Sequence, residues 1–321
     1  MIMPSHPNWR PTASIEILQA RARILAKIRQ FFAERQVLEV DTPMLSQKTV
    51  TDPYVIGIPA SFQLPSGQKR EVFLQTSPEY AMKRLLAAGS GPIYQLSKAF
   101  RQGDLGRFHQ PEFTMLEWYR PGYDHHALMD EMDALLRVTM CTAPADRISY
   151  ADLFENYLAI NPHAISLNAL QTCVQKNIVY NGELNDKTVC LDLLLTHCIE
   201  PLMGKDRPVF LYDFPVFQAA LAKIQECSPP VASRFEVYFK GIELANGFHE
   251  LQDAAEQRRR FENDLTYRCQ HNLPTVELDE AFLAALQHGL PDCAGVALGV
   301  DRLIMLALGA KTIRDVISFS F

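Results

Sequence analysis

Hydrophobic positions at three- and four-residue spacing mark the first recognisable element of the chain. Ile15, Leu18, Ala22, Leu25, Ile28 and Phe32 form one apolar stripe. This period predicts an amphipathic helix over residues 14–35. The β-type run at 37–40 follows and stops before Pro43, because proline does not continue a strand ladder. We therefore expect a helix that leads directly into a short strand.

Further along, apolar runs alternate with helical segments. We expect strands near 72–74, 93–100, 113–120, 208–214 and 235–251, and helices at 78–88, at 253–267 and at the end of the chain. The stretch 124–206 predicts helices with polar connections. Antiparallel-looking strands with helices grouped between them favour an α+β fold over a parallel βαβ layout. No linker or internal repeat divides the chain, so we expect one domain over residues 1–321 with a mostly helical insertion around 124–206.

Composition narrows the class of protein. The chain has 321 residues, 48% hydrophobic and 21% charged, with a formal net charge of −6. These values exclude disordered, collagen-like and coiled-coil proteins, and the acidic balance disfavours a broad phosphate-binding surface. The 7 cysteines are scattered without a C-x-x-C pair, which argues against a disulfide framework or a zinc site. Residues 1–7 lack a signal-type apolar run and 294–310 is interrupted by charges, so we expect a cytoplasmic protein without a membrane partner.

The segment 100–119 carries a dense set of aromatic and polar side chains. Two strands joined by a loop of about ten residues form an antiparallel pair. In the second strand Phe113, Met115, Glu117 and Tyr119 share one face by alternation. A ring, a carboxylate and a phenol on one face favour a binding surface, and the loop residues Arg101 and Arg107 suit phosphate oxygens. The alternative is a solvated loop above a half-polar sheet.

Two glutamates, Glu243 and Glu250, lie in the last β-rich stretch. If the chain turns at 246–247, Glu243 pairs directly across from Glu250. If it turns at 240–241, the rest is one strand, and a one-residue bulge at Gly247 brings both carboxylates to one face. Like charges held together favour a bound cation, and two carboxylates with phosphate oxygens are a typical Mg²⁺ environment. The alternative is two independently solvated glutamates.

Two further segments lie where a helix is expected to begin. The small-residue strand at 295–299 leads into a helix that begins near Arg302. Glycines let a flat ring approach the backbone closely, and a helix start also favours an anion. The run Thr-Ser-Pro-Glu-Tyr at 76–80 is typical of a helix N-terminus, so capping explains Glu79 on local grounds.

In this order and spacing, these segments resemble the signature motifs of class II aminoacyl-tRNA synthetases of the lysyl type. The helix ending at 37–43 resembles motif 1, residues 100–117 motif 2 and residues 295–302 motif 3. Residues 243–250 resemble the acidic strand before motif 3. The resemblance covers nearly the whole chain. It implies a class II synthetase-type antiparallel sheet flanked by helices, in a single catalytic domain.

The resemblance also implies roles for individual residues. The catalytic residues would be Arg101, on the α-phosphate of ATP, and Arg302, which with Phe113 would enclose the adenine. Mg²⁺ would be held by Glu243 and Glu250. The implied ATP-binding set is Arg101, Gln102, Gly103, Gln110, Phe113, Glu243, Leu244, Gly299 and Arg302. The implied amino-acid pocket is Ser77, Pro78, Glu79, Glu117, Tyr119, Asn246, Glu250 and Ala297. In it Glu79 would take a backbone-type ammonium, and Glu117, Tyr119, Asn246 and Glu250 a side-chain amine.

Three features depart from the lysyl type. Motif 1 begins almost at residue 15, which leaves no room for an N-terminal anticodon-binding domain. Ala297 stands where the lysyl type has glycine, and Gln102-Gly103 stands where Asn-Glu is usual, with Asp104 a candidate substitute. The first two departures resemble a group of lysyl-type paralogues without that domain. This resemblance implies activation of (R)-β-lysine by ATP and its transfer to a lysine ε-amine on elongation factor P, with no tRNA.

Other functions stay open at this point. A stand-alone lysyl-type enzyme that charges tRNA is disfavoured by the absent anticodon domain and the acidic balance. A non-catalytic, synthetase-like regulatory protein is favoured by Gly103. It is disfavoured by four retained residues, Arg101, Glu243, Glu250 and Arg302. By the same resemblance, we expect a homodimer through the motif 1 region.

Overall fold

The computed structural model describes residues 9–321, and the stretch 1–7, for which no signal-type run was expected, lies outside them. The helices are α1 (Ile15–Ala33), α2 (Glu79–Ala87), α3 (His125–Met140), α4 (Tyr150–Leu158), α5 (Leu167–Asn177), α6 (Lys187–Leu194), α7 (Ala254–Gln270), α8 (Glu280–Gly289) and α9 (Val300–Ala307). The strands are β1 (Leu38–Glu39), β2 (Leu45–Ser46), β3 (Ile58–Gln63), β4 (Lys69–Leu74), β5 (Ile93–Phe100), β6 (Glu112–Pro121), β7 (Asp146–Ser149), β8 (Val209–Pro215), β9 (Ile224–Gln225), β10 (Val231–Phe239), β11 (Ile242–His249) and β12 (Cys293–Gly299). Short π- or 3₁₀-helical turns are η1 (Leu195–Ile199), η2 (Glu200–Leu202), η3 (Val216–Gln218) and η4 (Ile313–Val316).

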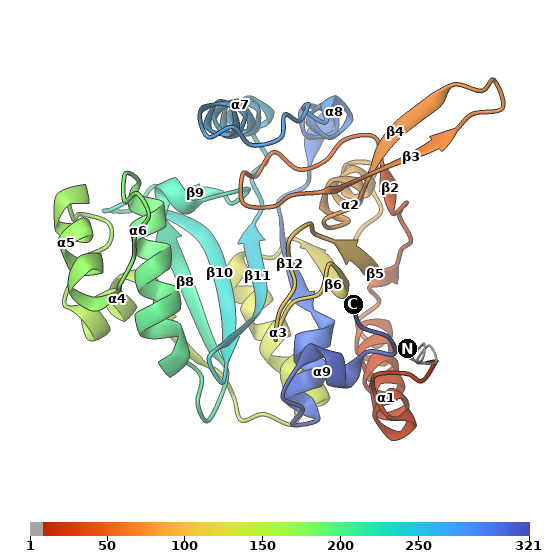
Figure 1. Ribbon diagram of the computed structural model, residues 1–321, viewed down its shortest axis with the longest axis horizontal. Helices are drawn as coiled ribbons and strands as arrows, with labels where there is room; N and C mark the ends of the chain where they lie inside the picture. Colours follow the sequence, from red (N-terminus) through yellow and green to blue (C-terminus); the bar gives the residue numbers. More distant parts are fainter. Residues whose placement is uncertain (1–8) are drawn as a thin grey trace, which may run out of the picture.

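A large sheet forms the centre of the molecule (Figure 1). Within the described residues it has nine strands, in the order β1-β5-β6-β12-β11-β10-β8-β7, with β9 paired to β10. The inner pairs are antiparallel, and the pairs β1–β5 and β7–β8 at the two ends are parallel. The expected α+β fold, an antiparallel sheet flanked by helices, is confirmed.

The two faces of this sheet differ in chemistry. Leu116 and Trp118 of β6 and Val296 and Leu298 of β12 are buried in an apolar core with residues of α1, α3 and α9. Because successive side chains of a strand point to opposite faces, the residues between them point to the other side. That second face carries the polar side chains described below.

The stretch 124–206 is built from two parts. Helix α3 belongs to the main core, since Leu128 and Met132 are buried there, and β7 joins the edge of the large sheet. Helices α4, α5 and α6 form a second apolar cluster beside β8, at one end of the sheet (Figure 1). The division of the chain into one domain with an insertion stays a prediction.

Strands β2, β3, β7 and β9 and helix α8 were not expected from the sequence. Strands β2 and β3 pair with β4 in a separate small sheet that projects from the body (Figure 1). Strand β3 is largely exposed, so it lacks the hydrophobic alternation that identifies a strand. Helix α8 is short and packs against α2 through Phe282 and Leu286, a contact that no local pattern indicates. No helix within residues 9–321 is both long and apolar enough to cross a lipid bilayer.

The hairpin of β10 and β11 decides between the two turns considered above. The chain turns at Lys240 and Gly241, whose φ angles are 52° and 70°, so the turn at 246–247 is wrong. A bulge is present, but Val237 pairs with Ala245 and Tyr238 with Glu243, which makes Leu244 the extra residue. The bulge expected at Gly247 is therefore wrong: Gly247 pairs regularly, and a Cβ there would lie 2.5 Å from the Phe235 ring.

Candidate active site

A row of directly paired residues crosses the polar face of the sheet. Gln95 pairs with Glu117, Glu117 with Ala297, Ala297 with Asn246, and Asn246 with Glu236. The row runs from β5 to β10. Its residues on β6, β12, β11 and β10 form the floor of the site, whereas Gln95 is not among the residues that line it. Gln95 and Glu117 are buried, and Gln95 Nε2, Gln95 Oε1 and Glu117 Oε2 have no hydrogen-bond partner. Buried polar atoms without partners are costly, so this floor is suited to a polar ligand.

A cavity of about 1100 Å³ lies above this row. Its lining brings together Glu79 from the start of α2, Glu117 and Tyr119 from β6, and Glu250 from the end of β11. Phe113 and Met115 line it as well, so the alternating face expected for residues 113–119 faces one space. The cavity is large enough for a nucleotide together with an amino acid.

A buried lysine lies among the carboxylates. Lys83 Nζ is 2.7 Å from Glu79 Oε1 and 2.6 Å from Glu250 Oε2, and the Lys83 side chain is 1% exposed. The Tyr119 hydroxyl donates a hydrogen bond to Glu117 Oε1 at 2.6 Å. We call Glu79, Glu117 and Glu250 the carboxylate cluster. Its three acidic groups face one internal ammonium.

Burial changes the protonation of these groups. Burial and the charge of Glu79 raise the pKa of the Glu117 carboxyl to about 8. Burial also raises the pKa of Glu250, against the opposing charge of Lys83. For Lys83, burial alone lowers the pKa, but the charges of Glu250 and Glu79 outweigh it and hold the pKa above its usual value. Lys83 is therefore charged at neutral pH, whereas Glu117 holds a proton when no ligand is bound.

Small residues on β12 make room beside the cluster. A Cβ at Gly295 would lie 2.6 Å from Glu250 Oε1 and would overlap the Tyr119 ring. Glycine is required there, since nothing larger fits between these groups. Ala297, the next residue on the same face, lines the cavity between Glu117 and Asn246. Its methyl group is thus part of the pocket wall.

Arg234, on the neighbouring strand β10, orients the Asn246 side chain. Arg234 Nε donates to Asn246 Oδ1 at 3.2 Å, and Arg234 Nη1 donates to the carbonyl of Gln218 at 2.9 Å. Glu236 accepts from Arg234 and from the Tyr238 hydroxyl. Because the amide oxygen of Asn246 is already engaged, its amide nitrogen is the group left for a ligand, and an amide nitrogen only donates. This arrangement suits a carboxylate or phosphate oxygen better than the amine expected from the sequence.

Arg302 is fixed at the start of α9. It donates to the carbonyls of Phe108 at 3.2 Å and Glu243 at 2.7 Å, and it contacts His109 Nε2 at 2.6 Å. Burial and the charge of Arg302 lower the pKa of His109, so the neutral ring accepts this hydrogen bond. The Arg302 side chain is thereby held at the cavity wall by the loop of motif 2.

Arg101 and Phe113 lie at the two ends of this loop: Arg101 directly follows β5, and Phe113 is in β6. The Arg101 guanidinium lies over the Phe113 ring, 5.3 Å from its centroid. Arg101 Nε is buried without a hydrogen-bond partner, and both residues line the cavity. By contrast, Arg107 turns away and donates to the carbonyl of Lys311 at 3.0 Å. Arg101 is thus the loop arginine available to an anion in the cavity.

The two expected magnesium ligands have different neighbours. Glu250 forms the ion pair with Lys83, whereas Glu243 Oε2 lies 3.6 Å from Arg302 Nη1. Within residues 9–321 no cluster of three or more His, Cys, Asp or Glu side chains is arranged to hold a metal ion. The more open carboxylate, Glu243, fits Mg²⁺ that is bound mainly by phosphate oxygens. The assignment of both residues as metal ligands stays a prediction.

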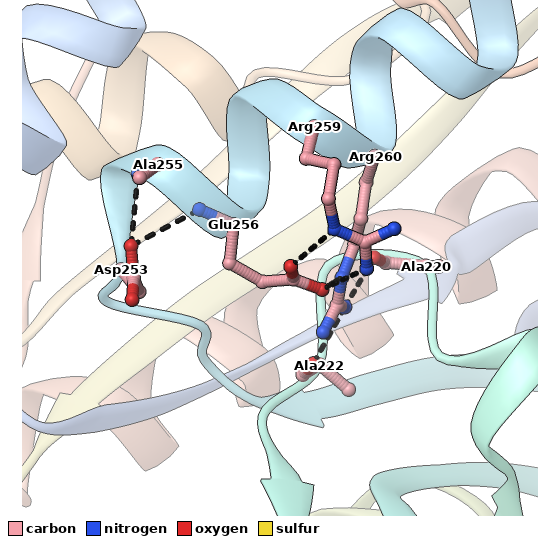
Figure 2. Close-up of polar contacts among 7 residues, drawn as sticks. All are labelled: Ala220, Ala222, Asp253, Ala255, Glu256, Arg259 and Arg260. Atoms are coloured by element: carbon pink, nitrogen blue, oxygen red, sulfur yellow. Dashed lines mark hydrogen bonds and ion pairs between the residues drawn. The ribbon is translucent and has the colours of Figure 1, made fainter.

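Helix α7 forms the roof of the cavity and is tied to the loop at 219–223 (Figure 2). Arg260 donates to the carbonyls of Ala220 and Ala222, both at 2.8 Å. Glu256 accepts from Arg259 and Arg260 on the same helix (Figure 2). Ala222 in turn bridges to Glu250. The roof is therefore connected by backbone pairing to the segment that carries Glu250.

Most of the expected site residues line the cavity. They are Ser77, Glu79, Arg101, Gln110, Phe113, Glu117, Tyr119, Glu243, Leu244, Asn246, Glu250, Ala297, Gly299 and Arg302. Pro78, Gln102 and Gly103 are not among the lining residues. The sequence did not indicate Lys83 or Arg234. The spacing of Glu79 and Lys83 fits an ion pair on a helix, but such pairs are usually at the surface.

Comparisons with known proteins cover the whole chain. The family model of class II tRNA synthetases (D, K and N) matches residues 5–321. The chain is 51% identical to the "Elongation factor P--(R)-beta-lysine ligase" of Salmonella gallinarum (strain 287/91 / NCTC 13346), over 99% of each protein. Ligases of the same name from Salmonella paratyphi B and Edwardsiella ictaluri show the same identity and coverage. The similarity thus includes every segment that lines the cavity.

Proposed function

Because the chain belongs to the class II tRNA synthetases (D, K and N), we propose that it is an ATP-dependent ligase that activates (R)-β-lysine and transfers it to elongation factor P. The product is an amide on the ε-amine of one lysine of that protein. The observation that carries the proposal is the carboxylate cluster, in which the buried Glu117 and Glu250 and the partly buried Glu79 lie near Lys83. The names of the relatives support the same reaction.

A diamino acid fits this cavity by charge. Glu79 receives the ammonium nearer the carboxylate of the substrate, and Glu117, Tyr119 and Glu250 receive the ammonium at the other end. The free amide nitrogen of Asn246 donates to the substrate carboxylate in this proposal, whereas the contact with a side-chain amine that the sequence led us to expect stays a prediction. Buried carboxylates are costly without a partner, so they favour a substrate that brings two positive charges.

The first reaction is adenylate formation. A carboxylate oxygen of the substrate attacks the α-phosphorus of ATP, the bond from that phosphorus to the diphosphate oxygen breaks, and diphosphate leaves. Arg101 neutralises charge that develops on the α-phosphate, and Phe113 and Arg302 hold the adenine. The protein contributes through positioning and fixed charges, and needs no covalent intermediate of its own.

The second reaction forms the amide. The neutral ε-amine of the acceptor lysine attacks the carbonyl carbon of the adenylate, the bond to the phosphate oxygen breaks, and AMP leaves. One proton passes from the attacking nitrogen to solvent. The proposed reaction does not involve tRNA.

ATP is a substrate of this reaction, and Mg²⁺ is its proposed counter-ion. Bound Mg²⁺ would neutralise the phosphate oxygens of ATP. Glu243, with Glu250 as the second expected ligand, would hold it. The positioning of substrate and adenine depends on the side chains described above.

Intact-mass measurement tests the proposed function. Elongation factor P is incubated with the enzyme, ATP and either (R)-β-lysine or α-lysine. We expect a mass increase of one lysyl group that is larger in extent with (R)-β-lysine. Acylated tRNA without any modified elongation factor P would contradict the proposal and favour a tRNA-charging enzyme. No amino-acid-dependent diphosphate exchange with either isomer would favour a non-catalytic protein.

We further propose a homodimer through the motif 1 region. Ile15 of α1, Leu38 of β1, and Met44 and Leu45 at β2 are exposed apolar side chains. Their burial against a second copy would remove this surface from water. Light scattering at micromolar concentration is expected to give twice the chain mass, and a monomer would contradict the proposal.

A further inference from the structure

Lys83 lies behind the substrate pocket and connects two distant parts of the chain. It is one helical turn after Glu79 on α2, and its second partner, Glu250, follows β11. The ammonium lies 2.7 Å from an oxygen of Glu79 and 2.6 Å from an oxygen of Glu250. Lys83 is not among the residues that line the cavity. It therefore acts on a ligand through these two carboxylates.

The surroundings of Lys83 leave one oxygen of each carboxylate for a ligand. Glu79 gives Oε1 to Lys83, and Glu250 gives Oε2. The remaining oxygen of Glu250, Oε1, is beside Gly295 on the cavity wall. On its other side, Lys83 Nζ lies 5.8 Å from the centroid of the Phe282 ring, which stacks on Tyr80. The ammonium is thus held between two carboxylates and an aromatic face.

The charges of the cluster can be counted. In the ligand-free site Glu117 holds a proton. When a ligand ammonium takes the place of that proton, Glu79, Glu117 and Glu250 carry three negative charges, and Lys83 supplies one positive charge. The cluster then lacks two positive charges, which is the number that a diamino acid brings. Breaking a buried ion pair by removing one partner leaves an uncompensated charge. Lys83 therefore affects both the orientation of the carboxylates and the charge of the ligand they accept.

We propose that Lys83 is a positioning residue that fixes Glu79 and Glu250 toward the cavity and makes the pocket selective for a dicationic amino acid. This inference rests on the proposed function, in which the substrate is a diamino acid. It assigns a role in substrate binding to a residue that the substrate does not contact. It explains why a lysine is buried directly behind a pocket for a lysine-like ligand.

The test measures binding directly, so it does not depend on turnover. Calorimetry with a non-hydrolysable ATP analogue and Mg²⁺ gives the Kd of (R)-β-lysine for the wild type, Lys83→Met and Arg84→Met. Arg84 is the exposed neighbour on the same helix and serves as the matched control. We expect Lys83→Met to weaken binding by at least about tenfold, because Glu79 and Glu250 lose the ammonium that fixes their orientation toward the cavity. Arg84→Met should stay within about twofold of the wild type.

A rescue experiment separates charge from packing. Lys83→Ala removes the part of the side chain that n-propylammonium resembles. We expect n-propylammonium to restore most of the lost affinity in this variant, and the neutral n-propanol to restore little. Equal rescue by both compounds would overturn the inference, because packing alone would then explain the role of Lys83. If Lys83→Met does not fold by circular dichroism, Lys83→Gln, which keeps hydrogen bonding without charge, takes its place.

The outcomes distinguish this inference from the proposed function. Equal affinity in the wild type and in the charge-removing variant overturns the inference and leaves the proposed function standing. A wild-type protein that binds neither diamino acid overturns both. A wild type that binds the diamino acid but modifies no elongation factor P leaves the inference supported and the acceptor wrong.

Discussion

Gly295 and Gly299 lie on the same face of β12 and have different surroundings. A Cβ at Gly295 would overlap the Tyr119 ring and the Glu250 carboxylate, whereas at Gly299 the nearest atom is 3.7 Å away. We expect Gly295→Ala to reduce amino-acid-dependent diphosphate exchange by about 100-fold, since small displacements of binding groups have effects of this size. Gly106→Ala, at a position outside the cavity lining where a Cβ meets no atom within 4 Å, is the control and should retain most of the activity. Equal loss in both variants would contradict this explanation.

Ala297 places a methyl group on the cavity wall between Glu117 and Asn246. We expect Ala297→Gly to increase the use of α-lysine relative to (R)-β-lysine by roughly tenfold, since one methyl group in a pocket changes discrimination by about this much. The ratio of kcat/KM for the two isomers in diphosphate exchange measures it. An unchanged ratio would show that the methyl group does not select between them.

Residue-level reasoning found the pocket acids but not their counter-ion. Alternation along one strand was enough to place Glu117 and Tyr119 on one face. Lys83 was missed, because its second partner is Glu250, far away in the sequence. Asn246 was found, but the donor that occupies its oxygen, Arg234, is on another strand. The identity of a side chain is local information, whereas its partner is not.

At the scale of elements, α7 and the loop at 219–223 are linked by Arg260 (Figure 2). We expect Arg260→Ala to lower the free energy of unfolding by about 2 kcal/mol, because two carbonyls lose a charged donor. The KM for the diamino acid should also rise, since Ala222 bridges to Glu250. Arg258→Ala, whose side chain pairs with Glu280 on the surface, is the control for urea unfolding. If both substitutions lower the free energy of unfolding by a similar small amount, the stabilising role of Arg260 is contradicted.

The elements that were predicted are long and periodic, and those that were missed are short or exposed. Helix α1 and strands β5 and β6 follow clear hydrophobic patterns. Helix α8 has only ten residues, which is too short for a clear hydrophobic period. Packing against α2 stabilises it. The bulge at Leu244 was placed at Gly247, because a glycine is a frequent bulge residue. In the fold, Gly247 instead makes room for the Phe235 ring.

For the whole molecule, the buried Glu117 predicts a pH dependence of stability. Its pKa is raised from 4.5 to about 8 on folding, so the folded state binds this proton more tightly than the unfolded state. Its contribution is fully present below pH 4.5 and is lost as the pH rises toward 8. In this window the free energy of unfolding falls by about 1.4 kcal/mol per pH unit from this group. Urea unfolding of the ligand-free wild type and Glu117→Gln at several pH values measures it, and a stability difference that is constant with pH would contradict it.

The sequence by itself determined the α+β class, the main strands and helices, and the residue types at the pocket. These depend on local hydrophobic periods and on motifs, which are written along the chain. Only the tertiary structure decided that Glu79, Glu117 and Glu250 share one cavity and that Lys83 lies between two of them. Strand register and the packing of α2 bring these residues together. Such contacts depend on which surfaces meet in space, and their energies come from burial and charge that a single stretch of sequence does not contain.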